Sequence, residues 1–193
     1  MQRGEAVRKG VFKMKKKRAR RKFSAKRDNL PPETRRLAEE KIEENLFSLK
    51  GFTDAENYFV YLGVGGEVPT ANIISRLLNL GKNIYVPKIS GEDMLAVRAG
   101  AKMKNNRFGI PEPEGTEEAA RIDVCITPLV AADSSLNRIG RGKGYYDRFF
   151  AAHPCVKIGV CYAAQVYKKT FDTEAGDVPL DFLVTEKGTE KRS

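Results

Sequence analysis

The segment 137–148, NRIGRGKGYYDR, combines the residue types and the spacing needed to bind a phosphate group. Glycine alternates with Arg or Lys through Gly140–Gly144, so a bare backbone can bring its amide N–H groups close to an anion while two cations add charge. The pattern then predicts a helix from about Tyr146, whose N-terminal amides also favour an anion. Asp147, in the first turn of that helix, would be repelled by a polyphosphate unless a divalent cation lay between them, so it is a candidate Mg²⁺ ligand.

Other interpretations of this segment compete with phosphate binding. A Walker A loop is excluded, because Gly142 and Lys143 are followed by Gly144 instead of Ser or Thr. A short Arg-Gly element that binds nucleic acid stays open. So does a purely structural Asp147 that only matches the dipole of its helix.

A second Gly-rich loop, Gly63–Thr70 (GVGGEVPT), follows an apolar run typical of a buried strand. It resembles a dinucleotide-binding fingerprint only superficially, because Val68 replaces the third glycine and Glu67 would point a carboxylate at the pyrophosphate. A carboxylate at the mouth of a strand is better placed to accept hydrogen bonds from an amino-substituted heterocycle, such as a pterin ring. An exposed loop glutamate that binds nothing is the simpler alternative.

Positive charge is concentrated at the N-terminus. The net charge is +10, but residues 1–27 hold thirteen Lys or Arg and one Glu, a net of +12, so the rest of the chain carries −2. Such an arm suits nucleic acid, a membrane surface, a transit peptide or an anionic ligand. Lys16 and Arg20 are four residues apart in a predicted helix, so they lie on one face and can hold a phosphate chain together. Solvated cations without a ligand are the alternative.

Helices and strands alternate along the rest of the chain. The expected helices cover 15–26, 32–49, 71–80 and 146–153, and the expected strands cover 57–62, 83–87, 94–98, 123–128, 156–161 and 182–185. The strands are apolar runs, which predicts a mainly parallel sheet covered by helices on both faces. Ligands bind such sheets at the carboxyl ends of the strands, which is where both Gly-rich loops fall.

The remaining composition excludes several classes of protein. The three cysteines, Cys125, Cys155 and Cys161, form no Cys-x-x-Cys or Cys/His cluster, which argues against a zinc site and for a reducing compartment. No apolar run approaches the ~18 residues of a membrane span, and the first residues lack the pattern of a secretory signal. The single histidine, His153, lies outside every motif, so we do not expect it to act as a general base.

The stretch Asp123–Arg148 resembles the signature of the 5-formyltetrahydrofolate cyclo-ligase family, also called methenyltetrahydrofolate synthetases, and GRGKGYYD is its most specific part. Other segments match that family in the same order: the Lys16 and Arg20 pair, YLGVGGEVPT at 61–70, YVPK at 85–88, FGIPEP at 108–113 and DVPLDFLVTEKG at 177–188. The resemblance covers residues 14–188. Two departures, Ala132 in place of an aromatic residue and Leu136 in place of a glycine, lie on the approach to the Gly-rich segment.

This resemblance implies a fold and a role for named residues. The fold is a single three-layer α/β domain over residues 14–188, similar to ribose-5-phosphate isomerase and CoA-transferase folds, and we expect a disordered basic extension at 1–13 and a tail at 189–193. The implied ATP contacts are Lys16, Arg20, Arg138, Ile139, Gly140, Arg141, Gly142, Lys143, Gly144, Tyr145 and Tyr146. The implied contacts with 5-formyltetrahydrofolate are Leu62, Glu67, Arg141, Gly142, Lys143, Gly144 and Tyr145. Catalytic roles fall to Arg141, Lys143 and Tyr145, and Mg²⁺ binding falls to Asp147 and Asp177.

The implied reaction is the ATP- and Mg²⁺-dependent closure of 5-formyltetrahydrofolate to 5,10-methenyltetrahydrofolate. The formyl oxygen attacks the γ-phosphate, N10 then attacks the activated carbon, and phosphate leaves, giving ADP and phosphate. We expect a cytoplasmic monomer with no nucleic-acid or membrane partner. The alternatives are a nucleic-acid-binding protein that uses the basic arm and a sugar-phosphate isomerase on the same fold.

Overall fold

The computed structural model describes residues 13–100, 102–106, 109 and 111–192, so the expected extension at 1–13 falls almost wholly outside it. The α-helices are α1 (Lys16–Asp28), α2 (Pro32–Phe47), α3 (Ala71–Asn79) and α4 (Tyr145–Ala152). Strands lie at the six predicted places: β1 (Asn57–Val60), β2 (Asn83–Ser90), β3 (Asp93–Arg98), β6 (Val124–Pro128), β9 (Val156–Val160) and β11 (Phe182–Thr185). The sequence pattern does not predict the others: β4 (Met103–Asn105), β5 (Pro111–Pro113), β7 (Ala131–Asp133), β8 (Arg138–Ile139), β10 (Val166–Tyr167) and β12 (Gly188–Lys191).

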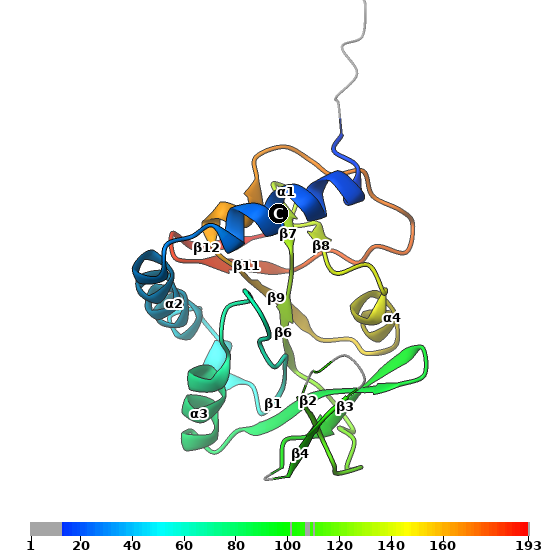
Figure 1. Cartoon of the computed structure of the whole chain (residues 1–193). Coiled ribbons are helices and arrows are strands. Elements are labelled where there is room, and N and C mark those ends of the chain that lie inside the picture. Colours follow the sequence, from blue (N-terminus) through cyan, green and yellow to red (C-terminus); the bar gives the residue numbers. More distant parts are fainter. Residues whose placement is uncertain (1–12, 101, 107–108, 110, 193) are drawn as a thin grey trace, which may run out of the picture.

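A seven-stranded sheet forms the centre of the molecule, with its strands in the order β12-β11-β9-β6-β1-β2-β3. The strands from β11 to β2 run parallel, and β12 and β3 add antiparallel edges. Figure 1 shows α2 and α3 on one side of this sheet and α4 on the other. The expected three-layer α/β fold with a mainly parallel sheet is therefore confirmed.

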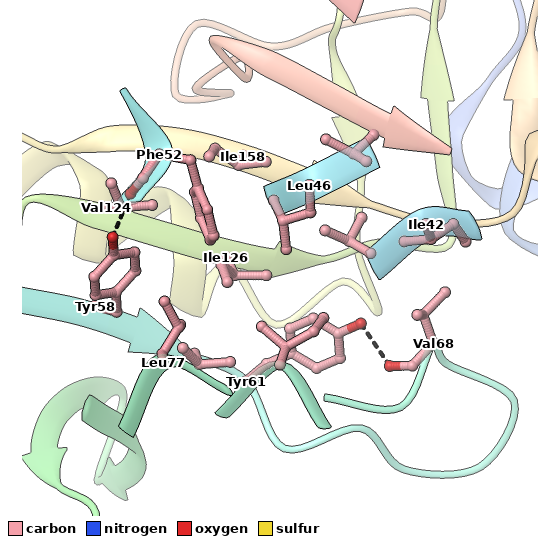
Figure 2. Close-up of a cluster of buried hydrophobic side chains, with 14 of the residues drawn as sticks. Ile42, Leu46, Phe52, Tyr58, Tyr61, Val68, Leu77, Val124, Ile126 and Ile158 are labelled. Atoms are coloured by element: carbon pink, nitrogen blue, oxygen red, sulfur yellow. Dashed lines mark hydrogen bonds between the residues drawn. The ribbon is translucent and has the colours of Figure 1, made fainter. Parts of the chain in front are cut away.

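Apolar side chains alternate between the two faces of the sheet, as the pleat of a strand requires. In β1, Tyr58 and Val60 pack in the cluster formed with α2 and α3, whereas Phe59 packs against Phe149 of α4. Figure 2 shows the first of these clusters, in which the Tyr58 hydroxyl also donates a hydrogen bond to the carbonyl of Phe52. Both faces of the sheet thus need a helical cover, which makes the three layers depend on one another.

Helix α1 lies over a second, three-stranded sheet of order β10-β7-β8 (Figure 1). It forms despite its like charges because Ala19 and Phe23, four residues apart, bury one face against Ala131, Ile139 and Phe171. Most of its Lys and Arg side chains are exposed on the opposite face, in water. The apolar seam fixes the helix beside the segment that enters and leaves β8.

Two parts of the chain differ from the expectations drawn from the sequence. Gly188–Lys191 pairs antiparallel with β11, so the sheet extends into the segment 189–193 that we expect as a tail. Leu136, which stands where the family resemblance places a glycine, has a φ of +58°, in the left-handed region that favours glycine. Its side chain is 3% exposed and packs in a cluster with Leu180, so its burial offsets the strained backbone.

Candidate active site

A cavity of ≈ 650 Å³ opens at the carboxyl ends of β1, β2 and β6. All fifteen site residues named from the sequence line it: Lys16, Arg20, Leu62, Glu67, Arg138, Ile139, Gly140, Arg141, Gly142, Lys143, Gly144, Tyr145, Tyr146, Asp147 and Asp177. The fold therefore brings to one place segments that lie far apart along the chain.

The cavity has two ends of different character. The cationic end is lined by Lys16, Arg20, Arg138, Arg141 and Lys143, with the carboxylates of Asp147, Glu174 and Asp177 among them. The hairpin end is lined by Pro87 and Ile89 of β2, Met94 of β3, and Asn106, Pro111 and Glu112 of the β4–β5 hairpin and its loop. In Figure 1, α1 and β8 lie at the top and the hairpins at the bottom.

The Arg20 guanidinium supports the Gly-rich segment directly. Its Nε donates a hydrogen bond of 2.9 Å to the carbonyl of Gly140. Gly142 has a φ of +97° and lies against the same guanidinium, so a Cβ there would come within 3.1 Å of Cζ of Arg20. Gly144, with a φ of +71°, then turns the chain into α4. The turn therefore requires glycine at 142 and 144, and the same lack of side chains leaves the backbone open to a ligand.

A buried carboxylate, Asp133, fixes the approach to this segment. Its Oδ1 accepts hydrogen bonds from the backbone N–H groups of Ser135 and Asn137, at 2.9 and 3.0 Å. Its Oδ2 accepts bonds from the Asn137 side chain, at 3.1 Å, and from the backbone N–H of Phe171, at 2.7 Å. Four N–H donors stabilise a buried charge that would otherwise be costly, and they set the direction in which the chain enters β8.

The Arg138 side chain, only 4% exposed, joins two segments that line the cavity. Its Nη2 lies 2.8 Å from Oδ1 of Asp147 in α4, and its Nη1 donates to the carbonyl of Val178. The N–H of Val178 donates to the same Asp147 oxygen at 3.1 Å. Asp147 therefore does more than match the dipole of its helix, because it holds the loop that carries Asp177 beside α4.

Lys16 connects α1 to the loop that precedes β11. Its Nζ lies 2.7 Å from Oδ1 of Asp177 and 3.2 Å from Oε1 of Glu174. Burial lowers the pKa of Lys16, but the hydrogen bonds and charges of these two acids together outweigh it, so the pKa is raised above its ordinary value. A predicted phosphate contact and a predicted metal ligand are thus direct partners of each other.

Glu67 pairs with Arg141 and is not a solvent-exposed loop residue. Its side chain is 9% exposed, and its Oε1 lies 2.8 Å from Nη2 of Arg141. Its Oε2 accepts a bond from the N–H of Val64 at 3.2 Å. The loop is anchored by the Tyr61 hydroxyl, whose pKa is raised by burial and which donates to the carbonyl of Val68 at 2.7 Å (Figure 2). The alternative of an exposed glutamate is therefore wrong, and the ion pair joins the two Gly-rich loops.

The cysteines and the histidine do not line the cavity. Burial raises the pKa of all three thiols, that of Cys155 to about 11, so they are protonated and weakly nucleophilic at neutral pH. The ring of His153 stacks on that of Phe149 with centroids 4.2 Å apart. Within the part of the chain that the structure describes, no group of three or more His, Cys, Asp or Glu could hold a metal ion.

A model of the 5-formyltetrahydrofolate cyclo-ligase family matches residues 12–186 of the chain. The chain belongs to this family. Among curated cyclo-ligases, the Haemophilus influenzae protein is 32% identical over 171 residues, which cover 82% of this chain and 91% of that protein. The Escherichia coli cyclo-ligase is 29% identical over 172 residues, which cover 83% of this chain and 94% of that protein.

Solved structures of methenyltetrahydrofolate synthetases share the fold of this cyclo-ligase family member. The structure from Aquifex aeolicus is 35% identical, has a TM-score of 0.81, and covers 91% of this chain and 92% of its own. The structure from Mycoplasma pneumoniae has a TM-score of 0.70 at 21% identity, over 89% of this chain and 98% of its own, which supports the fold alone.

The cyclo-ligase site has donor chemistry that fits a divalent cation shared with a polyphosphate. Asp147 and Asp177 both line the cavity, and the bonds to Val178 keep the segments that carry them together. Mg²⁺ in proteins is usually held by one or two carboxylates, with substrate phosphates and water completing the shell. Two carboxylates beside the Gly-rich segment match this arrangement, provided that a substrate phosphate supplies further ligands.

Sequence reasoning misses twelve residues that line the cavity: Tyr61, Val64, Pro87, Ile89, Met94, Asn106, Pro111, Glu112, Pro128, Leu129, Val130 and Glu174. Most are apolar residues at the ends of strands, and such residues carry no chemical signature in a sequence. Glu112 had one available signal, because it belongs to the FGIPEP segment that matches the cyclo-ligase family.

Proposed function

We propose that the protein converts 5-formyltetrahydrofolate to 5,10-methenyltetrahydrofolate, with ATP giving ADP and phosphate. The observation that carries this proposal is that every residue implied by the cyclo-ligase resemblance lines one cavity, in a chain that belongs to the family. Its volume of ≈ 650 Å³ is typical of a pocket for small molecules. Its two ends offer one place for a polyphosphate and another for a planar ring.

The cationic end would hold the triphosphate of ATP. The proposed contacts are Lys16, Arg20, Arg138, Ile139, Tyr146 and the segment from Gly140 to Tyr145. Phosphoryl transfer depends mainly on positioning and on neutralising charge. Lys143 is exposed and forms no ion pair with a described residue, so its ammonium group is available to the transferred phosphoryl group. Arg141 and Tyr145 would complete the catalytic set beside it.

Asp147 and Asp177 would hold Mg²⁺, which supplies further charge neutralisation for the phosphate chain when it is bound. In this proposal Arg138 and Lys16 act on the carboxylates as well as on the phosphates. Arg138 holds Oδ1 of Asp147, and Lys16 holds Oδ1 of Asp177, so each acid is oriented before the substrate arrives. The cations also limit the repulsion between two carboxylates at one site.

Leu62 and Glu67 would border the pterin of 5-formyltetrahydrofolate, together with residues Arg141 to Tyr145. Because Arg141 bonds to Glu67, the loop at the folate is positioned by a residue of the loop at the phosphates. The formyl oxygen would meet the γ-phosphate between these loops, and its phosphorylation turns a poor leaving group into a phosphate. N10 then closes the ring on the same carbon, and Lys143 and Arg141 stay beside the departing phosphate.

The proposal includes a cytoplasmic monomer whose partners are ATP and 5-formyltetrahydrofolate, with no nucleic acid or membrane. All three cysteines are free thiols, which supports a reducing compartment. No helix among the described residues is long and apolar enough to cross a membrane. If nucleic acid binds at all, the contact should reside in the exposed cations of the basic arm and weaken steeply with salt, without changing turnover.

The decisive experiment mixes the protein with MgATP and 5-formyltetrahydrofolate and follows the absorbance of the methenyl product. We expect product only when the protein, ATP and Mg²⁺ are all present, and a chelator should abolish it. Omitting ATP or replacing it with ADP is the matched control. A protein that folds normally but forms no methenyl product under these conditions would overturn the proposal.

A further inference from the structure

The hairpin end of the cavity contains a buried carboxylate, Glu112, that none of the proposed roles uses. It lies in β5, is 6% exposed and lines the cavity. Its Oε1 accepts hydrogen bonds from the backbone N–H of Ile89, at 2.9 Å, and from Nδ2 of Asn106, at 2.8 Å. No described Lys, Arg or His forms an ion pair with it. A buried carboxylate without a cation is costly unless further donors reach it.

The contrast with Glu67 is informative, because both acids line the same cavity. Glu67 has both of its oxygens engaged, one by the guanidinium of Arg141 and the other by the N–H of Val64. The two bonds to Glu112 from described residues both go to Oε1, and both come from uncharged donors. Of these two acids, Glu112 is therefore the one whose second oxygen, Oε2, keeps the capacity to accept hydrogen bonds from a ligand.

The surroundings of Glu112 define the kind of ligand. Pro87, Ile89, Met94 and Pro111 line this end of the cavity, so the walls are apolar and suit a flat ring. A carboxylate in such a place prefers two adjacent N–H donors, since it only accepts hydrogen bonds when ionised. The amino group and neighbouring ring N–H of a pterin provide that pair. Adenine places an acceptor nitrogen beside its amino group, which would face the carboxylate unfavourably.

We propose that Glu112 is a specificity-determining residue that accepts hydrogen bonds from the 2-amino and N3–H edge of the pterin of the folate substrate. This inference rests on the proposed function and points the 2-amino edge of the ring toward the hairpin end, with Leu62 and Glu67 bordering the ring as proposed above. The hairpin that carries Glu112 then acts as the wall that distinguishes a pterin from a purine.

Glu112→Gln is a sharp test, because glutamine keeps one carbonyl oxygen to accept the bonds from Ile89 and Asn106. It replaces only the second oxygen, with an NH₂ group that donates instead of accepting. The KM for 5-formyltetrahydrofolate should rise about 10- to 100-fold, with the KM for ATP and the thermal unfolding temperature unchanged. Glu114→Gln, an exposed change two residues along the same chain segment, is the matched control and should change neither KM.

A ligand-side measurement keeps the test independent of how the variant folds. Binding of 5-formyl-6-methyltetrahydropterin to the wild-type protein should be about 10- to 100-fold tighter than binding of the same compound without its 2-amino group. The Glu112→Gln variant should discriminate much less between the two. Equal binding of both compounds by the wild-type protein, or a rise in the KM for ATP alone, would overturn the role of Glu112. A wild-type protein with no turnover would instead overturn the proposed function.

Discussion

The two ends of the cavity are built in opposite ways. At the cationic end, Lys16, Arg20, Arg138 and Arg141 each contact a carboxylate or a carbonyl oxygen, and only the side chain of Lys143 lacks such a partner among the described residues. At the hairpin end, apolar side chains and Asn106 surround one carboxylate, Glu112, and none of the described residues that line that end is a cation.

This difference matches what the two proposed ligands, a phosphate chain and a planar ring, would require. Charges that are already held by partners need little reorganisation when a phosphate chain arrives, which favours a fast chemical step. A planar ring is recognised by the shape of an apolar slot and by a few well-placed polar groups. Changes at the cationic end should therefore act mainly on rate and on nucleotide binding, and changes at the hairpin end on the choice of substrate.

The largest effect is expected from removing the unpaired cation of the cationic end. Lys143→Ala should lower kcat by about 10²- to 10³-fold, because it deletes a charge next to the developing phosphate, and its exposed side chain adds little to stability. Steady-state kinetics and thermal unfolding check both statements. His153→Ala removes a ring outside the cavity and should be nearly silent. Comparable losses of turnover in the two variants would refute the role of Lys143.

A smaller effect should follow from covering the bare backbone. A Cβ at Gly140 meets no atom within 4 Å, so Gly140→Ala fits the fold. The added methyl group should still keep a phosphate from the backbone and raise the KM for ATP about tenfold, with the unfolding temperature unchanged. Gly142→Ala, at a φ of +97°, should in addition lower stability by about 1 kcal/mol. An unchanged KM for ATP in Gly140→Ala would place the phosphates elsewhere.

Leu136 lies just before β8, on the approach to the Gly-rich segment, and it tests how packing and backbone strain balance there. Removing a buried leucine side chain costs about 2–5 kcal/mol, whereas relief of a left-handed φ returns only about 1–2 kcal/mol. Leu136→Gly should therefore lower the free energy of unfolding by about 2 kcal/mol, within a range of about 0–4 kcal/mol, as measured by urea denaturation. Leu136→Ala keeps the strained backbone and should be less stable than the glycine variant. A glycine variant more stable than the wild type would show that strain outweighs packing here.

The smallest effect concerns pH. The pKa of Lys16 is raised in the folded protein by Asp177 and Glu174, so the ion pair stabilises the fold fully below the ordinary lysine pKa of 10.5 and less as pH rises through the folded value. Lys16→Met should lower the free energy of unfolding by on the order of 1 kcal/mol at pH 8. The difference from the wild type should shrink above pH ~10.5. A difference that stays constant to pH 11.5 would contradict the ion-pair account.

The sequence predicts the cationic end far better than the hairpin end. The Gly-rich segment, its two cations and Asp147 are contiguous, so their spacing alone indicates a phosphate site. The hairpin end draws one or two residues from each of β2, β3 and β5, and nothing in the sequence says that Met94 and Pro111 will line the same cavity. A local sequence pattern cannot predict contacts between residues that come together only when the chain folds.

Elements differ in the same way. Six of the seven strands of the main sheet lie at apolar runs that hydrophobicity predicts, and the polar edge strand β12 is the exception. β8 and β10 contain two residues each and carry too little pattern to be predicted. Both pair with β7, whose last residue, Asp133, accepts four hydrogen bonds from N–H donors. The bonds of Arg138 to Asp147 and Val178 likewise depend on the tertiary fold. The matching segments therefore predict that these residues matter, but they do not predict which of them bond to one another.

The bond between Lys16 and Asp177 spans 161 positions along the chain. Proteins are synthesised from the N-terminus onward. Helix α1 therefore leaves the ribosome long before the loop that carries Asp177 has been made. The helix cannot be held by that ion pair until synthesis has passed Asp177, so a nascent or prematurely terminated chain has no complete site. Activity should thus appear only after synthesis is nearly complete, and a truncated chain that lacks Asp177 should have no activity.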